Sequence, residues 1–367
     1  MTSKWDLDTP ALLVDYDIVQ QNVARMQRKA EQAGVSLRPH TKTHRTPALA
    51  QMQVQAGAAG ITVAKVGEAE VMAAHGLRDI LIANQIYGDA KLERLRRVAR
   101  SARVAVGVDN AVQVEALARV FRSEPQPLPV RIEVEVGEQR SGLVPGRELV
   151  QLARLIAQTP GLEFEGLFSH EGHTYGADSP EECAELFRVS QQDTLTAARL
   201  IKEAGIDCRV VSIGATPSLL LGEILPGVTE IRPGTYILMD AAQGNAIGDF
   251  SRCAATVLAT VVSKPIPHRL VLDAGVKALT AFTRERGICV TPGHGIVKRY
   301  GERISKLYDE HALLNSEVAY RELAIGDKVE IIPNHICPTC NLYDRIWLVR
   351  GDEIIAELPV ACRGKSQ

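Results

Sequence analysis

The sequence predicts an α/β protein made of a (β/α)8 TIM-type barrel and a second, mainly β domain at its C-terminal end. From residue 20 to about 240, short β-rich runs alternate with helical patterns, and there are eight such runs. After residue 250 the strand-like runs are separated by turns, with little helix. Eight βα units in roughly 200 residues match a parallel barrel better than an open sheet. We therefore place the barrel in 20–250 and the β domain in 251–367.

The barrel strands are expected in runs rich in β-branched and aliphatic residues. They are 35–39, 60–64, 80–83, 103–108, 130–136, 164–169, 209–213 and 229–233. A plausible helix follows each of the first seven, and 18–33 and 66–76 have the clearest helical patterns. No glycine-rich dinucleotide fingerprint follows the first strand, which argues against a Rossmann domain. The opening segment TPALLVDYD is strand-like, so residues 1–19 could join either domain.

Composition excludes several classes of function. The formal net charge is −2, so no electrostatic footprint for nucleic acid or for an anionic membrane is visible. No apolar run approaches the roughly 18 residues that a membrane span needs, and the N-terminus has no apolar signal core. We expect a cytoplasmic protein. Its seven cysteines are scattered, as buried thiols of a reducing compartment would be, and only the Cys337/Cys340 pair suggests more.

The end of the first barrel strand carries the first candidate for chemistry. Barrel enzymes place catalytic groups at the C-terminal ends of their strands, and here the sequence is RPHTKTH. If the extended conformation continues, Arg38, His40, Lys42 and His44 share one face. A lysine beside other cationic groups has a lowered pKa, and the neutral amine is the form that Schiff-base chemistry requires. The alternative is an ordinary surface lysine.

Polar groups also follow the fifth and sixth strands. EVGEQRSG offers Arg140, and SHEGHTYG offers His170, His173 and Tyr175. Taken alone, the histidines could be structural and the tyrosine could belong to the core. After the seventh and eighth strands come SIGATPS and IRPGTY, small turns with glycine and hydroxyl groups. Backbone N–H groups in such turns can bind phosphate, which barrels commonly hold at this position. Together with Lys42, they indicate a phosphorylated aldehyde cofactor.

Near the C-terminus, PNHICPTCNLYD contains two candidate metal ligands. His335 and Cys337 are two residues apart and would point to the same side of an extended segment. Imidazole and thiolate suit Zn²⁺, with positions left for water or substrate, although a chance His beside a buried Cys gives the same pattern. Cys337 and Cys340 also have the spacing of a redox pair, but the helix N-terminus and βαβ context of such pairs are not predicted here.

RPHTKTH, SIGATPS, RPGTY and NHICPTCNLYD together resemble the fold-type III pyridoxal-phosphate enzymes with the alanine-racemase barrel. Within them the chain resembles the metal-dependent branch of D-threonine aldolases, D-serine dehydratases and 3-hydroxy-D-aspartate lyases, over nearly its whole length. The resemblance implies that Lys42 carries the cofactor, that Arg140 lies near its phenolic oxygen and that Tyr175 faces its pyridine nitrogen. It also implies phosphate binding by Gly214, Thr216, Gly234, Thr235 and Tyr236, metal ligation (Zn²⁺ or Mn²⁺) by His335 and Cys337, and a homodimer.

The resemblance implies a lyase that acts on D-β-hydroxy-α-amino acids. A base on the β-hydroxyl, with His170 or His173 as candidates, would cleave the Cα–Cβ bond to glycine and an aldehyde. Removal of the α-proton by Lys42 would instead eliminate the hydroxyl, as D-serine or D-threo-3-hydroxyaspartate dehydratases do. SHEGHTYG resembles the dehydratase form of this loop, whereas bacterial-looking chains of this type often belong with the D-threonine aldolases. We prefer the aldolase.

Two further alternatives come from other classes. An amino-acid racemase on the same barrel would need a second base, for which Tyr300 and Tyr308 are candidates, but it has no use for His335 and Cys337. A cofactor-binding protein without catalysis would be a short single barrel, and the β domain from about 250 onward argues against it.

Overall fold

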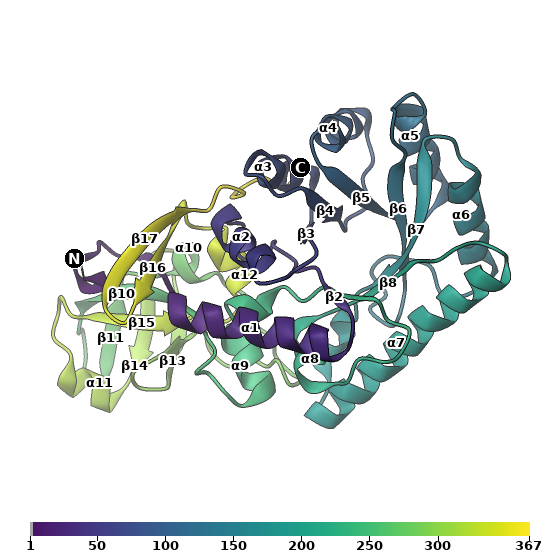
Figure 1. The fold of residues 1–367 in the computed structure, drawn as a ribbon. Coiled ribbons are helices and arrows are strands. Elements are labelled where there is room, and N and C mark those ends of the chain that lie inside the picture. The colour runs from purple at the N-terminus through teal and green to yellow at the C-terminus, as the bar shows by residue number, and fades with distance from the viewer. Residues whose placement is uncertain (1–2) are drawn as a thin grey trace.

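The computed structural model describes residues 3–367, and its first unit is an eight-stranded parallel sheet surrounded by helices (Figure 1). The strands lie in the order β2-β9-β8-β7-β6-β5-β4-β3. Their bounds are β2 Ser36–Leu37, β3 Ile61–Val63, β4 Asp79–Ile82, β5 Arg103–Val108, β6 Leu128–Val134, β7 Leu162–Ser169, β8 Val210–Ile213 and β9 Glu230–Ile231. The α/β barrel prediction is confirmed, and each of the eight predicted runs contains one of these strands or overlaps it.

Strands β2 and β3 stand at the two ends of this order. Hydrogen bonds between β3 and the residues that follow β2 join them and close the barrel. The Thr62 amide donates to the Pro39 carbonyl and the Thr41 amide donates to the Thr62 carbonyl, both at 2.8 Å. A single parallel bridge joins His40 to Thr62. Extended structure therefore stops at His40, and a turn follows. Lys42 lies in that turn, directly after the point where the barrel closes.

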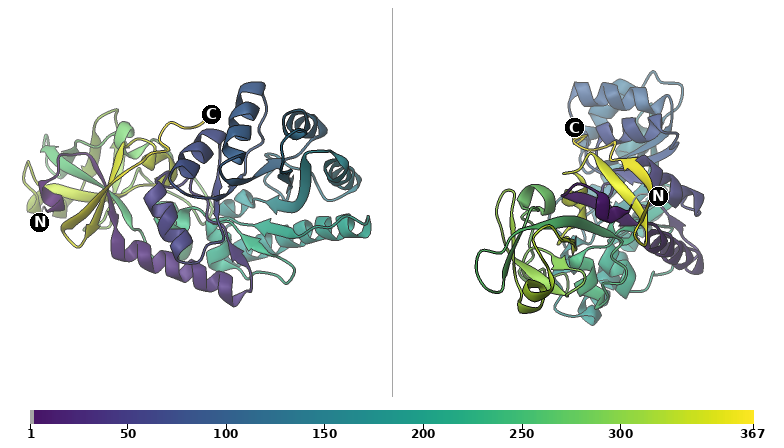
Figure 2. Two further views of the ribbon diagram at one scale, coloured as in Figure 1. Left: turned by 45° about the horizontal axis from the view of Figure 1, so that its top comes forward. Right: turned by 90° about the vertical axis from the view of Figure 1, so that its left-hand side faces the viewer.

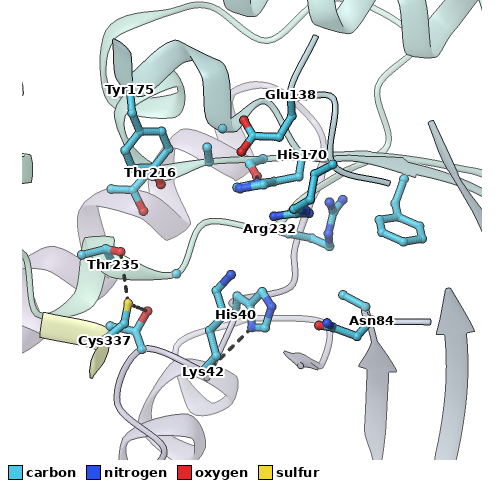
Figure 3. A pocket seen from close by; sticks show the side chains of 18 of the residues that line it. His40, Lys42, Asn84, Glu138, His170, Tyr175, Thr216, Arg232, Thr235 and Cys337 are labelled. Carbon is cyan, nitrogen blue, oxygen red and sulfur yellow. Dashed lines mark hydrogen bonds between the residues drawn. The ribbon is translucent and has the colours of Figure 1, made fainter. Parts of the chain in front are cut away.

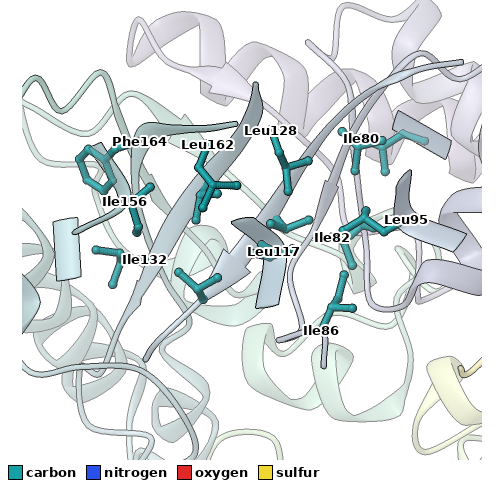
Figure 4. Close-up of a cluster of buried hydrophobic side chains, with 14 of the residues drawn as sticks. Ile80, Ile82, Ile86, Leu95, Leu117, Leu128, Ile132, Ile156, Leu162 and Phe164 are labelled. Carbon is teal, nitrogen blue, oxygen red and sulfur yellow. The ribbon is translucent and has the colours of Figure 1, made fainter. Parts of the chain in front are cut away.

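One helix precedes the first barrel strand, and the others follow along the chain between or after the strands. The helices are α1 Tyr16–Gln32, α2 Pro47–Gln55, α3 Val66–Ala74, α4 Asp89–Ala99, α5 Ala111–Phe121, α6 Arg147–Gln158, α7 Pro180–Glu203, α8 Thr216–Leu221 and α9 Ala241–Ile247. Branched residues of the strands, such as Ile82 and Ile132, pack with Leu95, Leu117 and Ile156 of the helices, and all of them are buried (Figure 4). This aliphatic layer holds the barrel together, because each buried side chain of this kind contributes roughly 1.5–3 kcal/mol.

The second unit is a nine-stranded, mainly antiparallel sheet in the order β11-β14-β13-β12-β15-β10-β1-β16-β17. Its strands are β1 Ala11–Asp15, β10 Ala255–Ser263, β11 Arg269–Leu272, β12 Ile296–Val297, β13 Glu302–Leu307, β14 Ala312–Asn315, β15 Lys328–Ile332, β16 Arg345–Arg350 and β17 Glu353–Pro359. The mainly β prediction is confirmed. Since β1 pairs with β10 and β16, the opening segment joins this sheet and α1 carries the chain to the barrel.

The chain passes between the barrel and the β unit more than once, and the two units lie side by side (Figure 2). The last residues return to the barrel, where the Cys362 amide donates to the Arg45 carbonyl and the Gly67 amide donates to the Gln367 carbonyl. Short helices α10 Val276–Leu279, α11 Glu317–Glu322 and α12 Ile336–Cys340 interrupt the β unit. The prediction that His335 and Cys337 lie in an extended segment is wrong, because α12 begins directly after His335. In residues 3–367 no helix has the length and apolar character of a membrane span.

Candidate active site

A cavity of about 430 Å³ lies where the C-terminal ends of the barrel strands meet the β unit (Figure 3). The sequence motifs after five barrel strands and the segment around α12 all contribute to its wall. The lining side chains used below are His40, Lys42, Glu133, Arg140, His170, Tyr175, Thr216, Arg232, Thr235, Arg284, His335 and Cys337, together with Gly214 and Gly234. The pocket is therefore built from both units.

Lys42 points into the centre of this cavity from the turn after β2, beside His40 (Figure 3). Burial lowers the pKa of Lys42, and the positive charges of Arg140 and Arg232 lower it further, although Cys337 opposes them. The amine is thus shifted toward its neutral, nucleophilic form. The Lys42 amide lies 3.4 Å from His40 Nδ1, which helps to hold the turn.

Two neighbours of Lys42 do not share its face, contrary to prediction. Arg38 points into the barrel interior, where its Nε lies 2.6 Å from Glu230 Oε2. His44 is fully buried behind the turn, with its Nε2 3.2 Å from Gln53 Oε1. The extended geometry that would have aligned them ends at His40, so only His40 and Lys42 line the cavity.

The turns after β8 and β9 form a cradle in the cavity wall, next to the turn that carries Lys42. A Cβ on Gly214 would lie 2.7 Å from the Arg232 backbone nitrogen, and one on Gly234 would lie 3.0 Å from Thr43 Oγ1. Among the described residues, buried Thr216 Oγ1 has no hydrogen-bond partner. Buried hydroxyls are normally paired, so this one is available to a ligand at the start of α8. The cradle fits a phosphate group.

Tyr236 and His173 lie outside the cavity lining, although both were expected in the site. The Tyr236 hydroxyl accepts a 2.9 Å hydrogen bond from Gln53 Nε2 in the core. His173 packs over Gly137, and its Nε2 lies 3.4 Å from Ser190 Oγ. The tight 3-10 helix η2 (Gly172–Gly176) turns His173 away from the pocket while Tyr175 faces it. We therefore do not retain His173 as a base.

His170 presents a neutral imidazole to the cavity. Its Nδ1 lies 3.1 Å from the Gly214 carbonyl oxygen, which can only accept, so Nδ1 carries the hydrogen and Nε2 is left as an acceptor. Burial, together with the charges of Lys42 and Arg140, lowers the pKa of His170 to about 3. Burial also raises the pKa of Tyr175 well above its ordinary value, so its hydroxyl stays protonated.

Several charged residues of the site were not singled out from the sequence, among them Arg232, Asp240 and Arg284. Arg232 is buried beneath the cavity, where its Nη1 lies 2.6 Å from Ser212 Oγ. Asp240 supports His335 from behind, and Arg284 reaches the cavity from a loop of the β unit. Arg232 stands inside the RPGTY motif and could have been noticed there. Asp240 and Arg284 have no local signal, because only the fold brings them to the pocket.

His335 and Cys337 face the cavity together from the start of α12. Burial disfavours the charged forms of the His335 imidazole and the Cys337 thiol. The attraction between the two opposite charges favours those forms. The pKa of Cys337 is lowered by His335, and that of His335 is raised to about 10 by Cys337 and Asp240. Imidazole and thiolate fit a soft divalent metal, which would displace the proton. Residues 3–367 contain no cluster of three or more metal-ligating side chains, so water or substrate would supply the remaining ligands.

The surroundings of Cys337 and Cys340 argue against the hypothesis that the two cysteines form a redox pair. A short helix, α12, does begin directly after His335, contrary to expectation, but both cysteines are free thiols. Cys340 is fully buried, and burial raises the pKa of its thiol well above the ordinary value. A resolving thiol must be accessible and at least partly ionised, and Cys340 is neither.

Two family models match this chain. Residues 14–242 match the alanine racemase N-terminal domain, and residues 254–349 match a serine dehydratase domain. A barrel with a lysine in the cavity at its strand ends and a cradle that fits a phosphate, followed by such a β domain, defines the class of fold-type III pyridoxal-phosphate enzymes. The chain belongs to the alanine racemase-type family, in the branch whose members include D-threonine aldolases and D-threo-3-hydroxyaspartate dehydratases.

Similar proteins extend over nearly the whole chain. A D-threonine aldolase of Arthrobacter sp is 33% identical over 98% of this chain and 94% of its own length. A D-threo-3-hydroxyaspartate dehydratase of Delftia sp. (strain HT23) is 33% identical over 91% of this chain and 92% of its own length. Both relatives are lyases, so the lyase class is shared while the reaction differs between them.

Solved structures give the same picture. The D-threonine aldolase from Filomicrobium marinum superposes with a TM-score of 0.90 at 32% identity and covers 99% of this chain and 97% of its own. The D-threo-3-hydroxyaspartate dehydratase from Delftia sp. HT23 superposes with a TM-score of 0.91 at 29% identity and covers 98% of this chain and 99% of its own. A variant of a D-threo-3-hydroxyaspartate dehydratase in which a cysteine is replaced by alanine has a structure described as a metal-free form, at 28% identity and a TM-score of 0.89, which points to a metal in that enzyme.

Proposed function

We propose that this protein is a pyridoxal-phosphate- and divalent-metal-dependent lyase that cleaves D-β-hydroxy-α-amino acids to glycine and an aldehyde, as a D-threonine aldolase does. The observation that carries the proposal is the neutral imidazole of His170, which faces the same cavity as Lys42 and the His335–Cys337 pair. A neutral histidine with a free Nε2 is the acceptor that a retro-aldol cleavage needs at the β-hydroxyl.

The residues present fit both prosthetic groups. Lys42 Nζ would attach the cofactor aldehyde, Arg140 and Tyr175 would contact its ring, and the cradle of Gly214, Thr216, Gly234 and Thr235 would hold its phosphate. When bound, pyridoxal phosphate supplies an electron sink for a carbanion at Cα. His335 and Cys337 would hold Zn²⁺ or Mn²⁺, which acts as a Lewis acid toward the substrate's β-oxygen.

The chain's own residues then have separate tasks. His170 Nε2 accepts the proton of the β-hydroxyl while the Cα–Cβ bond breaks and the β-carbon leaves as an aldehyde. The electron pair of that bond stays on Cα, and a proton delivered there completes glycine. The lowered pKa of His170 leaves its imidazole unprotonated at neutral pH but also makes it a weak base. A divalent metal at the β-oxygen would make the hydroxyl more acidic and would ease this proton transfer.

Dehydration of D-serine or D-threo-3-hydroxyaspartate is the second candidate. The lowered pKa of Lys42 favours it, because a neutral amine can remove the α-proton instead and lead to elimination of the hydroxyl. A racemase has less support. Tyr300 donates to Glu322 and Tyr308 is exposed on the β unit, and neither lines the cavity of the described chain.

Product analysis with D-threonine tests the proposal. The metal-loaded holoenzyme should release glycine and acetaldehyde in equal amounts. Release of 2-oxobutyrate and ammonia instead would replace the aldolase with the dehydratase. H170Q should abolish cleavage while H173Q, whose side chain lies outside the cavity, should retain it. We also expect a homodimer, which light scattering of the purified protein would detect.

A further inference from the structure

We infer that Arg284 is the residue that binds the carboxylate of the substrate amino acid. The inference rests on the proposed function only for the substrate class, since every D-β-hydroxy-α-amino acid carries an α-carboxylate with a fixed negative charge. A desolvated carboxylate needs a cationic partner or several hydrogen-bond donors in the pocket.

The other cations that line the cavity already have partners or tasks. His335 is paired with Asp240, with its Nδ1 3.2 Å from Asp240 Oδ2, and is a candidate metal ligand. Lys42 is the candidate cofactor anchor. Arg140 Nη2 lies 3.2 Å from Glu133 Oε1. Arg232 Nη1 and Nη2 donate to Ser212 Oγ and to the Ser169 carbonyl beneath the cavity. In residues 3–367, Arg284 forms no ion pair, and no donor bond from its guanidinium is found.

The Arg284 guanidinium is nevertheless held in place. Its central carbon lies 4.8 Å from the centroid of the Tyr175 ring and 5.4 Å from that of Phe282. Contact with two aromatic rings orients the planar group and leaves its edge of N–H donors free, which suits a carboxylate.

The backbone of the Arg284 loop is fixed by hydrogen bonds within the loop and to the segment after Tyr175. The Arg284 amide donates to Thr291 Oγ1 at 2.6 Å, and the Thr291 amide returns a bond to the Arg284 carbonyl at 2.9 Å. The Ile288 amide donates to the Ala177 carbonyl at 2.7 Å, which ties the loop to the segment after Tyr175.

The same loop also contacts the candidate metal ligands. The Phe282 ring lies 4.7 Å from that of His335, and Asn334 Nδ2 donates to the Phe282 carbonyl. The loop thus spans the distance between the Tyr175 wall and the candidate metal ligands. Arg284 is held between these two walls, on the lining of the cavity that the substrate would enter.

The test compares two amines that differ only in the carboxylate. Glycine and methylamine are titrated into the cofactor-loaded enzyme, and binding is followed by the change in the visible absorbance of the cofactor. R284Q should raise the Kd of glycine by about 10- to 100-fold, because it removes charge-assisted hydrogen bonds. The Kd of methylamine should stay within about twofold, and its binding shows that the pocket of the variant is intact. R284K should lie between wild type and R284Q.

The control is R286Q, which changes an exposed arginine of the same loop that does not line the cavity. It should leave both Kd values unchanged. Equal effects of R284Q on glycine and methylamine, or no effect on either, would overturn the inference. The measurement does not depend on turnover, so a protein that binds glycine through Arg284 but releases no glycine from D-threonine would refute only the proposed function.

Discussion

His335 Nδ1 lies 3.2 Å from Asp240 Oδ2, and Asp240 is completely buried. The carboxylate is fixed from three directions, because Oδ2 also accepts from the Ile336 amide at 3.0 Å and Oδ1 accepts from the Gln243 amide at 2.9 Å. Because Nδ1 of His335 is bonded to Asp240, Nε2 is the ring nitrogen that remains available to a ligand in the cavity. A carboxylate behind a histidine is the usual support for a metal ligand.

Asp240 should therefore control metal affinity without touching the metal. D240N keeps the size of the side chain and its capacity to cap α9, but it removes the negative charge behind His335. We expect metal affinity to fall by about 10- to 100-fold, measured by competition with a chelator. D249N, at a half-buried position after α9, serves as the control and should bind metal like wild type. Equal affinity of D240N and wild type would remove Asp240 from the account.

The two cysteines of the CPTC segment should behave differently. C337A removes a thiolate that faces the cavity and should weaken metal binding, whereas C340A trims a buried side chain and should affect stability more than metal. The metal itself should be required for activity. Chelation should stop turnover of the wild type, and added Zn²⁺ or Mn²⁺ should restore it. Full activity in a chelated, metal-free sample would contradict the role of the metal.

The comparison of the two cysteine variants also has a clear contradicting outcome. Weaker metal binding by C340A than by C337A would move the ligand assignment.

The orphaned hydroxyl of Thr216 predicts a phosphate-specific effect. T216V preserves shape and removes the hydrogen-bonding group, so the apoprotein should bind pyridoxal phosphate about 10- to 100-fold more weakly. Pyridoxal, which lacks the phosphate, is the matched ligand and should bind both proteins alike. Fluorescence titration of the apoprotein measures both. A loss of equal size for the two ligands would mean that Thr216 supports the fold rather than the phosphate.

His44 should make stability depend on pH. Burial lowers its pKa to about 4, whereas in the unfolded chain the pKa is near 6.5. Between these values the unfolded state binds more protons, so this contribution is complete above pH 6.5 and is lost as the pH falls toward 4. From pH 7.5 to 5 the loss is about 2 kcal/mol. H44N should reduce this fall, which urea unfolding at both pH values would detect. An unchanged fall would contradict the burial argument.

Much of the fold could be predicted from the sequence because it depends on local patterns. Alternating β-rich runs and helical segments identified all eight barrel strands, and the polar strand ends identified Lys42, His170, Tyr175 and the Gly214 and Gly234 turns, which all line one cavity. Parallel barrels bring these ends to one face whatever the details of the loops. The class of site therefore followed from the order of the elements.

The errors concern local geometry that only tertiary structure determines. The chain turns after His40 because backbone bonds to Thr62 close the barrel there, so Arg38 and His44 leave the face of Lys42. The 3-10 helix η2 directs Tyr175 into the cavity and His173 out of it. Asp240 and Arg284 come from segments distant in the sequence, and no motif near either of them indicates where the fold places it.

The central claim is that Lys42 carries the cofactor, and one measurement tests it directly. Holoenzyme reduced with borohydride is digested, and the peptides are analysed by mass spectrometry. The reduced cofactor should be found on Lys42, and K42A should show neither this modification nor the visible absorbance of bound cofactor. K91A, at an exposed lysine of α4, should retain both. Modification of a different lysine, or a visible band retained in K42A, would contradict the account.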